Sequence, residues 1–124
     1  MVKTVMIVDD NPDVILSVKH GIEGNYTGYE VVSAESGQQC LEFLENNPIP
    51  DIILLDIMMP EMNGWLLQKK LQESIKWRNI PILFLTAIKD STSKKIGDVS
   101  SNGVIEKPFE INDLKLKIDS ILIN

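Results

Sequence analysis

Five short apolar segments alternate along the chain with segments whose apolar residues recur at helical spacing, and this alternation restricts the fold more than any other feature. The short segments are rich in β-branched residues and apolar at successive positions, as in strands buried on both faces. Such alternation predicts an α/β doubly wound fold, with a parallel five-stranded sheet, right-handed crossovers and helices on both faces. The expected strands are Val5–Val8, Tyr29–Ala34, Asp51–Leu55, Ile80–Leu85 and Val104–Ile105.

The intervening segments predict five helices. Asn11 is suited to cap the first of them, with Pro12 at the first helical position. The fourth is the weakest, because Ile96 and Val99 are its only clear apolar anchors. No repeat, low-complexity tract or linker is evident, so residues 1–124 are expected to form one domain. The expected helices are Pro12–Ile22, Ser36–Asn47, Trp65–Ile75, Ser91–Val99 and Ile111–Leu122.

Composition argues against several functional classes. The net charge of −6 disfavours a generic nucleic-acid binder, since such proteins carry a basic patch or stripe. Cys40 is the only cysteine and His20 the only histidine, so we expect no zinc site, a buried Cys40 and a solvated His20. The most apolar window, Ile52–Met59, is interrupted by Asp56 and too short to span a bilayer. With no signal-peptide pattern at the N-terminus, a soluble cytoplasmic protein is expected.

Polar residues follow four of the five expected strands. Asp9 and Asp10 end the first, Asp56 the third and Thr86 the fourth, and Lys107 comes just after the fifth. In open α/β sheets, ligands bind beyond the carboxyl ends of the strands. We therefore expect these side chains to meet at one edge of the sheet and to form the functional site.

The three aspartates predict a site for a hard metal ion. Asp56 lies within the run Ile52–Met59, where a carboxylate is costly unless it is paired or metal-bound. Carboxylates that share one edge repel each other and need a cation. Oxygen ligands without histidine or cysteine favour Mg²⁺, although ligand type alone leaves Ca²⁺ and Mn²⁺ open.

This set of residues suits phosphoryl transfer. A carboxylate can act as a nucleophile and form an aspartyl phosphate. A metal ion and Lys107 would offset the charge on the transferring group, and the hydroxyl of Thr86 could donate a hydrogen bond to one of its oxygens. The residues alone therefore indicate a metal-assisted phosphoryl acceptor.

Four motifs, in this order and at this spacing, resemble those of the receiver domains of two-component response regulators. The resemblance covers essentially the whole chain, and the stretch from aspartate to glycine is its most specific part. The motifs are Val8-Asp9-Asp10-Asn11-Pro12, Asp56-Ile57-Met58-Met59-Pro60-Glu61-Met62-Asn63-Gly64, Thr86-Ala87 and Lys107-Pro108-Phe109.

The resemblance implies a flavodoxin-like (βα)₅ sandwich with strand order 2-1-3-4-5 and a cis peptide bond before Pro108. It implies that Asp56 accepts a phosphoryl group from a phosphohistidine of a sensor kinase or a histidine phosphotransfer protein. Asp9, Asp10, Asp56 and the backbone carbonyl of Met58 would bind Mg²⁺. Thr86 would be the switch hydroxyl, and Lys107 would contact the phosphoryl group. The chain would then be a signalling switch, catalysing only its own phosphoryl transfer and slow autodephosphorylation.

Two departures from the family pattern concern the output face, which the resemblance places on the fourth helix, fifth strand and fifth helix, where a downstream target would bind. Val104 occupies a position that commonly holds an aromatic residue, and Ser100-Ser101-Asn102-Gly103 replaces a Gly-Ala segment. The main alternative function is a non-phosphorylated interaction module on the same fold, which predicts loss of the acidic pair or the lysine. A stand-alone hydrolase would need a substrate pocket, and the short loops leave little material for one. Flavin binding would need a loop that cradles phosphate after the first strand, where Asp9 and Asp10 would repel it.

Overall fold

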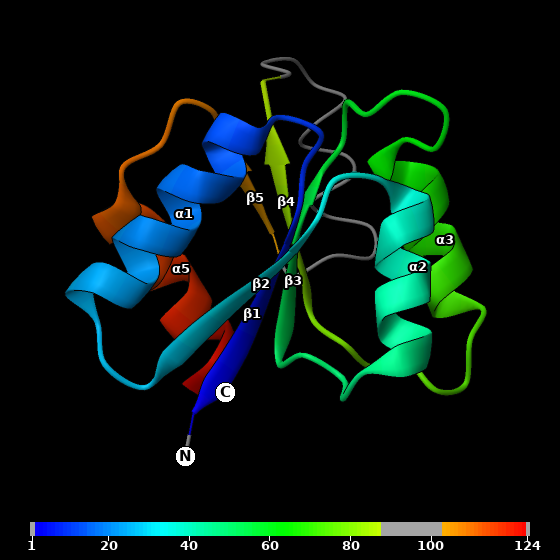
Figure 1. The fold of residues 1–124 in the computed structure, drawn as a ribbon, viewed down its shortest axis with the longest axis horizontal. Coiled ribbons are helices and arrows are strands. Elements are labelled where there is room, and N and C mark those ends of the chain that lie inside the picture. Colours follow the sequence, from blue (N-terminus) through cyan, green and yellow to red (C-terminus); the bar gives the residue numbers. More distant parts are fainter. Residues whose placement is uncertain (1, 88–102, 124) are drawn as a thin grey trace.

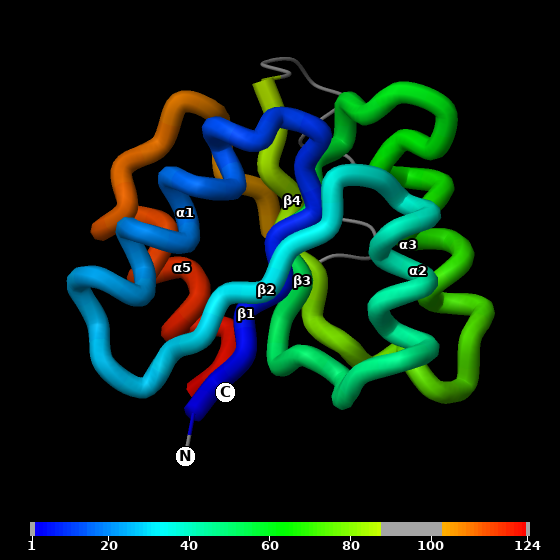
Figure 2. Tube along the Cα trace, viewed as in Figure 1, coloured from blue at the N-terminus to red at the C-terminus, as the bar shows by residue number. Residues whose placement is uncertain are grey.

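The computed structural model describes residues 2–87 and 103–123, and within them a parallel sheet is covered on both faces by helices (Figures 1 and 2). The strand order is β2-β1-β3-β4-β5, which confirms the predicted doubly wound, flavodoxin-like topology. The strands are β1 (Lys3–Val8), β2 (Tyr29–Ala34), β3 (Ile52–Asp56), β4 (Ile82–Thr86) and β5 (Val104–Glu106).

Helices α1 (Pro12–Asn25) and α5 (Ile111–Ile123) lie on one face of the sheet. Helices α2 (Gly37–Asn46) and α3 (Gly64–Gln72) lie on the other (Figure 1). The fourth helix, predicted at 91–99, lies outside the described residues. Asn11 and Ser36 cap α1 and α2, since their side chains accept from the backbone N–H groups of Asp13 and Gln39.

Alternate residues of the central strands fill two separate cores. In β3, Ile53 and Leu55 belong to the core beneath α2 and α3, whereas Ile52 and Leu54 belong to the core beneath α1 and α5. All four side chains are fully buried. This two-sided burial explains why the strand is continuously apolar, and it makes the polar residue at its end, Asp56, the exception.

The two residues singled out from composition lie where they were expected. Cys40 is buried on α2, and burial raises the pKa of its thiol to about 12, so it acts as a small apolar side chain. His20 is exposed on α1. Among the described residues, no helix is both long enough and apolar enough to cross a membrane.

The predicted end of the third helix is wrong. The helix ends at Gln72, and Ile75, expected to be an apolar anchor, is 82% exposed. The chain turns at Ser74, whose carbonyl oxygen accepts from the N–H groups of Trp77 and Arg78. Trp77 takes the buried position instead, with 8% exposure. The predicted strand at Ile80–Leu85 begins two residues later, at Ile82, and extends to Thr86.

Candidate functional site

Three carboxylates meet at the carboxyl edge of the sheet. Val8 in β1 pairs with Leu55 in β3, so the residues that follow them come together: Asp9 and Asp10 after β1, and Asp56 at the end of β3. One oxygen from each carboxylate lies within 4.8 Å of the other two. Asp9 and Asp56 are buried, with 0% and 4% exposure, whereas Asp10 is exposed. The predicted convergence of these acids is therefore present.

Asp9 is held by two donors. Its Oδ1 accepts from the backbone N–H of Asn11 at 2.9 Å, and its Oδ2 accepts from Lys107 Nζ at 2.7 Å. Asp9 also donates its own N–H to the carbonyl oxygen of Ala34 in the neighbouring strand. These bonds orient the buried carboxylate toward the shared edge.

The ionised form of the Asp56 carboxylate is unfavourable. Its Oδ1 accepts from the backbone N–H of Met58 at 3.2 Å and lies 3.4 Å from Lys107 Nζ. Burial, followed by repulsion from Asp9, raises the pKa of Asp56 to about 6, although Lys107 and the Met58 N–H act in the opposite direction. The negative form of Asp56 therefore lacks sufficient compensation from the protein alone, as expected at a position that binds a cation.

Lys107 reaches the acids from the turn between β5 and α5. Its backbone N–H donates to the carbonyl oxygen of Thr86 at 2.8 Å, and the peptide bond to Pro108 is cis, as predicted. Thr86 is fully buried at the end of β4, next to β5, where it pairs in register with Glu106. All five residues predicted from the strand ends thus lie at this edge of the sheet.

The loop after Asp56 is built around a close backbone approach. Gly64 donates its N–H to the carbonyl oxygen of Ile57 at 2.9 Å, and a Cβ at Gly64 would lie only 2.5 Å from the backbone oxygen of Asp56. Asn63 caps α3 by accepting from Leu66 N–H. Glu61 adopts φ 66°, in the left-handed region that residues other than glycine rarely adopt. The glycine therefore allows α3 to begin directly against the predicted acceptor.

Two features of the site were not found from the sequence. The first is the direct pairing of Lys107 with Asp9, because the strand order brings both residues to one edge but does not determine which side chains touch. The second is a groove of about 460 Å³ beside Lys107, between the start of α1 and the turn before α5. It is lined mainly by apolar surface, with Asp13 and Ser17 on the α1 side. Of the predicted site residues, Lys107 lines this groove, and Asp56 does not.

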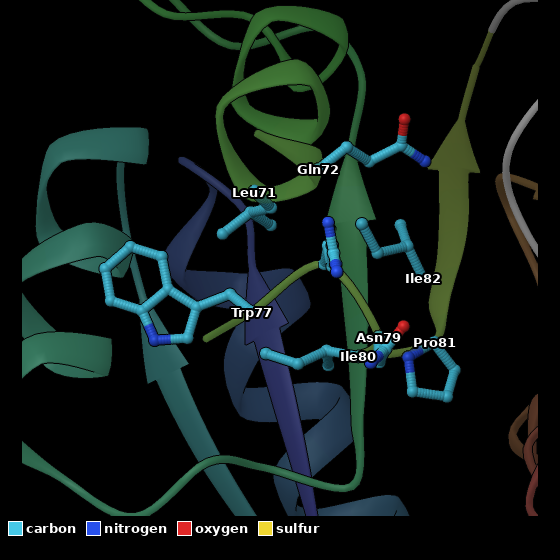
Figure 3. A pocket seen from close by; sticks show the side chains of 8 residues that line it. Leu71, Gln72, Trp77, Asn79, Ile80, Pro81 and Ile82 are labelled. Atoms are coloured by element: carbon cyan, nitrogen blue, oxygen red, sulfur yellow. The ribbon is translucent and has the colours of Figure 1, made fainter. Parts of the chain in front are cut away.

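A smaller hollow of about 250 Å³ lies near the start of β4, at the opposite end of that strand from Thr86. Figure 3 shows Leu71 and Trp77 on one side of it and Pro81 and Ile82 on the other. None of the predicted site residues lines this hollow, so it is separate from the acidic site.

The acidic cluster fits a hard divalent cation. Its donors are all carboxylate oxygens, two of the three side chains are buried, and the raised pKa of Asp56 reports uncompensated negative charge. Lys107 supplies one positive charge for three acids.

The chain belongs to the response regulator receiver domain family, whose profile matches residues 5–119. Chemotaxis response regulator CheY4 of Vibrio cholerae is similar over 98% of this chain and 100% of its own, with 28% identity and a TM-score of 0.87. The alkaline phosphatase synthesis regulator PhoP of Bacillus subtilis is 29% identical over 98% of this chain. Histidine kinase P4 of Formosa agariphila is 32% identical over the same share. The chain spans 49% of PhoP and 9% of that kinase.

Proposed function

We propose that the chain is a phosphorylation-activated switch in which Asp56 accepts the phosphoryl group. The observation that carries this proposal is the buried carboxylate of Asp56, with Asp9 and Asp10 within 4.8 Å and Lys107 Nζ at 3.4 Å. A carboxylate oxygen of Asp56 attacks phosphorus, the bond from phosphorus to the donor nitrogen breaks, and the electron pair stays on that nitrogen. The donor is a phosphohistidine of a sensor kinase or of a histidine phosphotransfer protein.

Mg²⁺ is the proposed cofactor, held by Asp9, Asp10, Asp56 and the backbone carbonyl of Met58. When bound, the ion offsets the negative charge of the acids and of the transferring group. The fit rests on the all-oxygen donor set and on the unfavourable ionisation of Asp56. The paired strands β1 and β3 hold Asp9 and Asp56 close together, so the arrangement of acids that would bind the ion exists before the phosphoryl group arrives.

Lys107 and Thr86 act on the transferred group. Lys107 Nζ lies between Asp9 and Asp56, so a small movement brings it to a phosphoryl oxygen on Asp56. Thr86 donates its hydroxyl hydrogen to another oxygen of the same group. Its backbone oxygen already accepts from Lys107 N–H, which links the two residues through one hydrogen bond.

The proposed partners bind different parts of the surface. The phosphodonor would occupy the groove beside Lys107, whose Nζ lies 3.4 Å from Asp56 Oδ1. The downstream protein would bind the face of the fourth helix, β5 and α5, where Leu116 and Ile123 of α5 are exposed. We further propose that residues 1–124 act as one receiver domain in the cytoplasm, without direct contact to nucleic acid or membrane. Its only catalytic activity would be the phosphorylation and dephosphorylation of Asp56.

Intact mass spectrometry after incubation with acetyl phosphate and Mg²⁺ tests the acceptor. The parent chain should gain the mass of one phosphoryl group, and Asp56→Asn should not. Asp51→Asn is the matched control, since Asp51 is exposed just before β3, and it should behave as the parent does. A gain retained by Asp56→Asn would assign the nucleophile to another residue. No gain in the parent would favour the alternative, a non-phosphorylated interaction module.

A further inference from the structure

The longer open edge of the sheet lacks the usual protection against pairing with another chain. The sheet ends at β2 on one side and at β5 on the other. β5 has three residues, whereas β2 has six, and its sequence YEVVSA contains neither lysine nor proline. Sheet edges commonly avoid association through short length, lysine, proline or a bulge. Glu30 is the one charged side chain of β2, so most of the protection of β2 must come from outside the strand.

The pairing with β1 shows which backbone groups of β2 face the open edge. Lys3 donates its N–H to the carbonyl oxygen of Gly28, and Asp9 donates its N–H to that of Ala34. Backbone direction alternates from one residue to the next, so the even-numbered residues of β2 face β1. The odd-numbered residues direct N–H and C=O outward, and Val31 is in the middle of this row.

Two side chains of α1 occupy both outward groups of Val31. Glu23 Oε2 accepts from Val31 N–H at 2.7 Å, and Lys19 Nζ donates to the Val31 carbonyl oxygen at 3.1 Å. Lys19 Nζ also lies 3.0 Å from Glu23 Oε2. Lys19 and Glu23 are four residues apart on one face of α1, and both are only partly exposed, with side-chain exposures of 44% and 31%. They form a closed arrangement that imitates a neighbouring strand at this point.

We propose that Lys19 and Glu23 form a clamp that keeps β2 from pairing with β2 of a second copy of this chain. The strand is self-complementary for antiparallel pairing about a two-fold axis at Val31. In that register Val31 would lie opposite Val31, Tyr29 opposite Ser33, and Glu30 opposite Val32. No like charges would lie directly opposite each other, and only the two Glu30 side chains would be diagonal neighbours. The strand itself therefore offers weak repulsion, and the clamp is the main obstacle to pairing.

Removal of both clamp residues tests the proposal. At concentrations low enough for the variant to be monomeric, Lys19→Ala/Glu23→Ala should exchange the Val31 amide hydrogen roughly tenfold faster than the parent, the factor expected for one lost charge-assisted hydrogen bond. The same variant should self-associate at concentrations at which the parent is monomeric, as measured by sedimentation velocity. Cooperative urea unfolding establishes that the variant is folded. Glu23→Gln retains a carbonyl acceptor and should remain monomeric.

The matched control removes another ion pair of the same residue types. Lys76→Ala/Glu45→Ala deletes a pair that is 3.7 Å apart and more exposed, at 69% and 56%, and it should remain monomeric. Ser33→Lys, added to the clamp variant, should restore the monomer, because it places a lysine on the open edge. The proposal is overturned if the clamp variant stays monomeric, if the control pair associates equally, or if Ser33→Lys does not reverse the association.

Discussion

Asp56→Asn should stabilise the metal-free protein, although it removes the proposed acceptor. The pKa of Asp56 rises from its ordinary value of 3.8 to about 6 on folding. The folded state therefore holds a proton on Asp56 more tightly than the unfolded state does, so stability falls as pH rises through this range. Above pH 6 the full cost of the charged form is about 3 kcal/mol, at 1.36 kcal/mol for each pH unit. Asparagine has nearly the same shape and no charge.

Urea unfolding at pH 8 and pH 5, with EDTA present, measures this effect. At pH 8 the variant should gain up to about 3 kcal/mol in free energy of unfolding, and at pH 5 about half of that, because Asp56 is then mostly protonated in the folded state. When EDTA is replaced by Mg²⁺, the difference in free energy of unfolding between Asp56→Asn and the parent should decrease. At about ten times its Kd, Mg²⁺ stabilises the parent by about 1.4 kcal/mol. An equal gain at both pH values, or a loss, would refute the reasoning.

Three further outcomes are expected around the site. Asp10→Asn should weaken Mg²⁺ binding, followed by the fluorescence of Trp65, which is 39% exposed at the start of α3; unchanged affinity would mean that the site is misplaced. Gly64→Ala should destabilise the fold by about 1–3 kcal/mol in urea and slow phosphorylation of Asp56, because the new Cβ would meet the Asp56 carbonyl oxygen at 2.5 Å. Glu61→Gly should stabilise the fold by about 1 kcal/mol by relieving the positive φ, and a loss of stability would contradict that strain.

The strands and the acidic site could be predicted because each depends on a local pattern. The limits of β2 are as expected, since Gly28 precedes a β-rich segment that ends at the capped helix α2. Asp56 stood out because a carboxylate interrupts a continuous apolar run, and parallel pairing of β1 with β3 then brings it beside Asp9. Neither inference needed more than the order of the strands.

The wrong end of α3 and the features that were not predicted concern properties that the pattern does not contain. Ile75 fits the helical period of α3, but the chain turns at Ser74, and Trp77 is buried in place of Ile75. The pairing of Lys107 with Asp9 depends on distances across the sheet, and the left-handed conformation of Glu61 depends on how the loop closes on Asp56. Periodicity indicates which apolar residues share one face of a helix, whereas packing decides which of them are buried.

The position of Val104 illustrates how a departure from the family pattern is accommodated. Val104 pairs in register with Phe84, which is fully buried, so the bulky ring of this strand pair belongs to β4 and the small side chain to β5. Phe84 and Thr86 are two positions apart and lie on the same face of β4. In the family pattern, an aromatic ring at the position of Val104 would rotate as Thr86 moves. The ring of Phe84 is already fully buried, and valine is too short to make such a rotation. The backbone connects β4 to β5 and the turn after it: Phe84 N–H donates to the carbonyl oxygen of Gly103, and the carbonyl oxygen of Thr86 accepts from Lys107 N–H at 2.8 Å. Movement of Thr86 toward a phosphoryl group on Asp56 would therefore pull β5 and the start of α5 directly, without rotation of an aromatic ring.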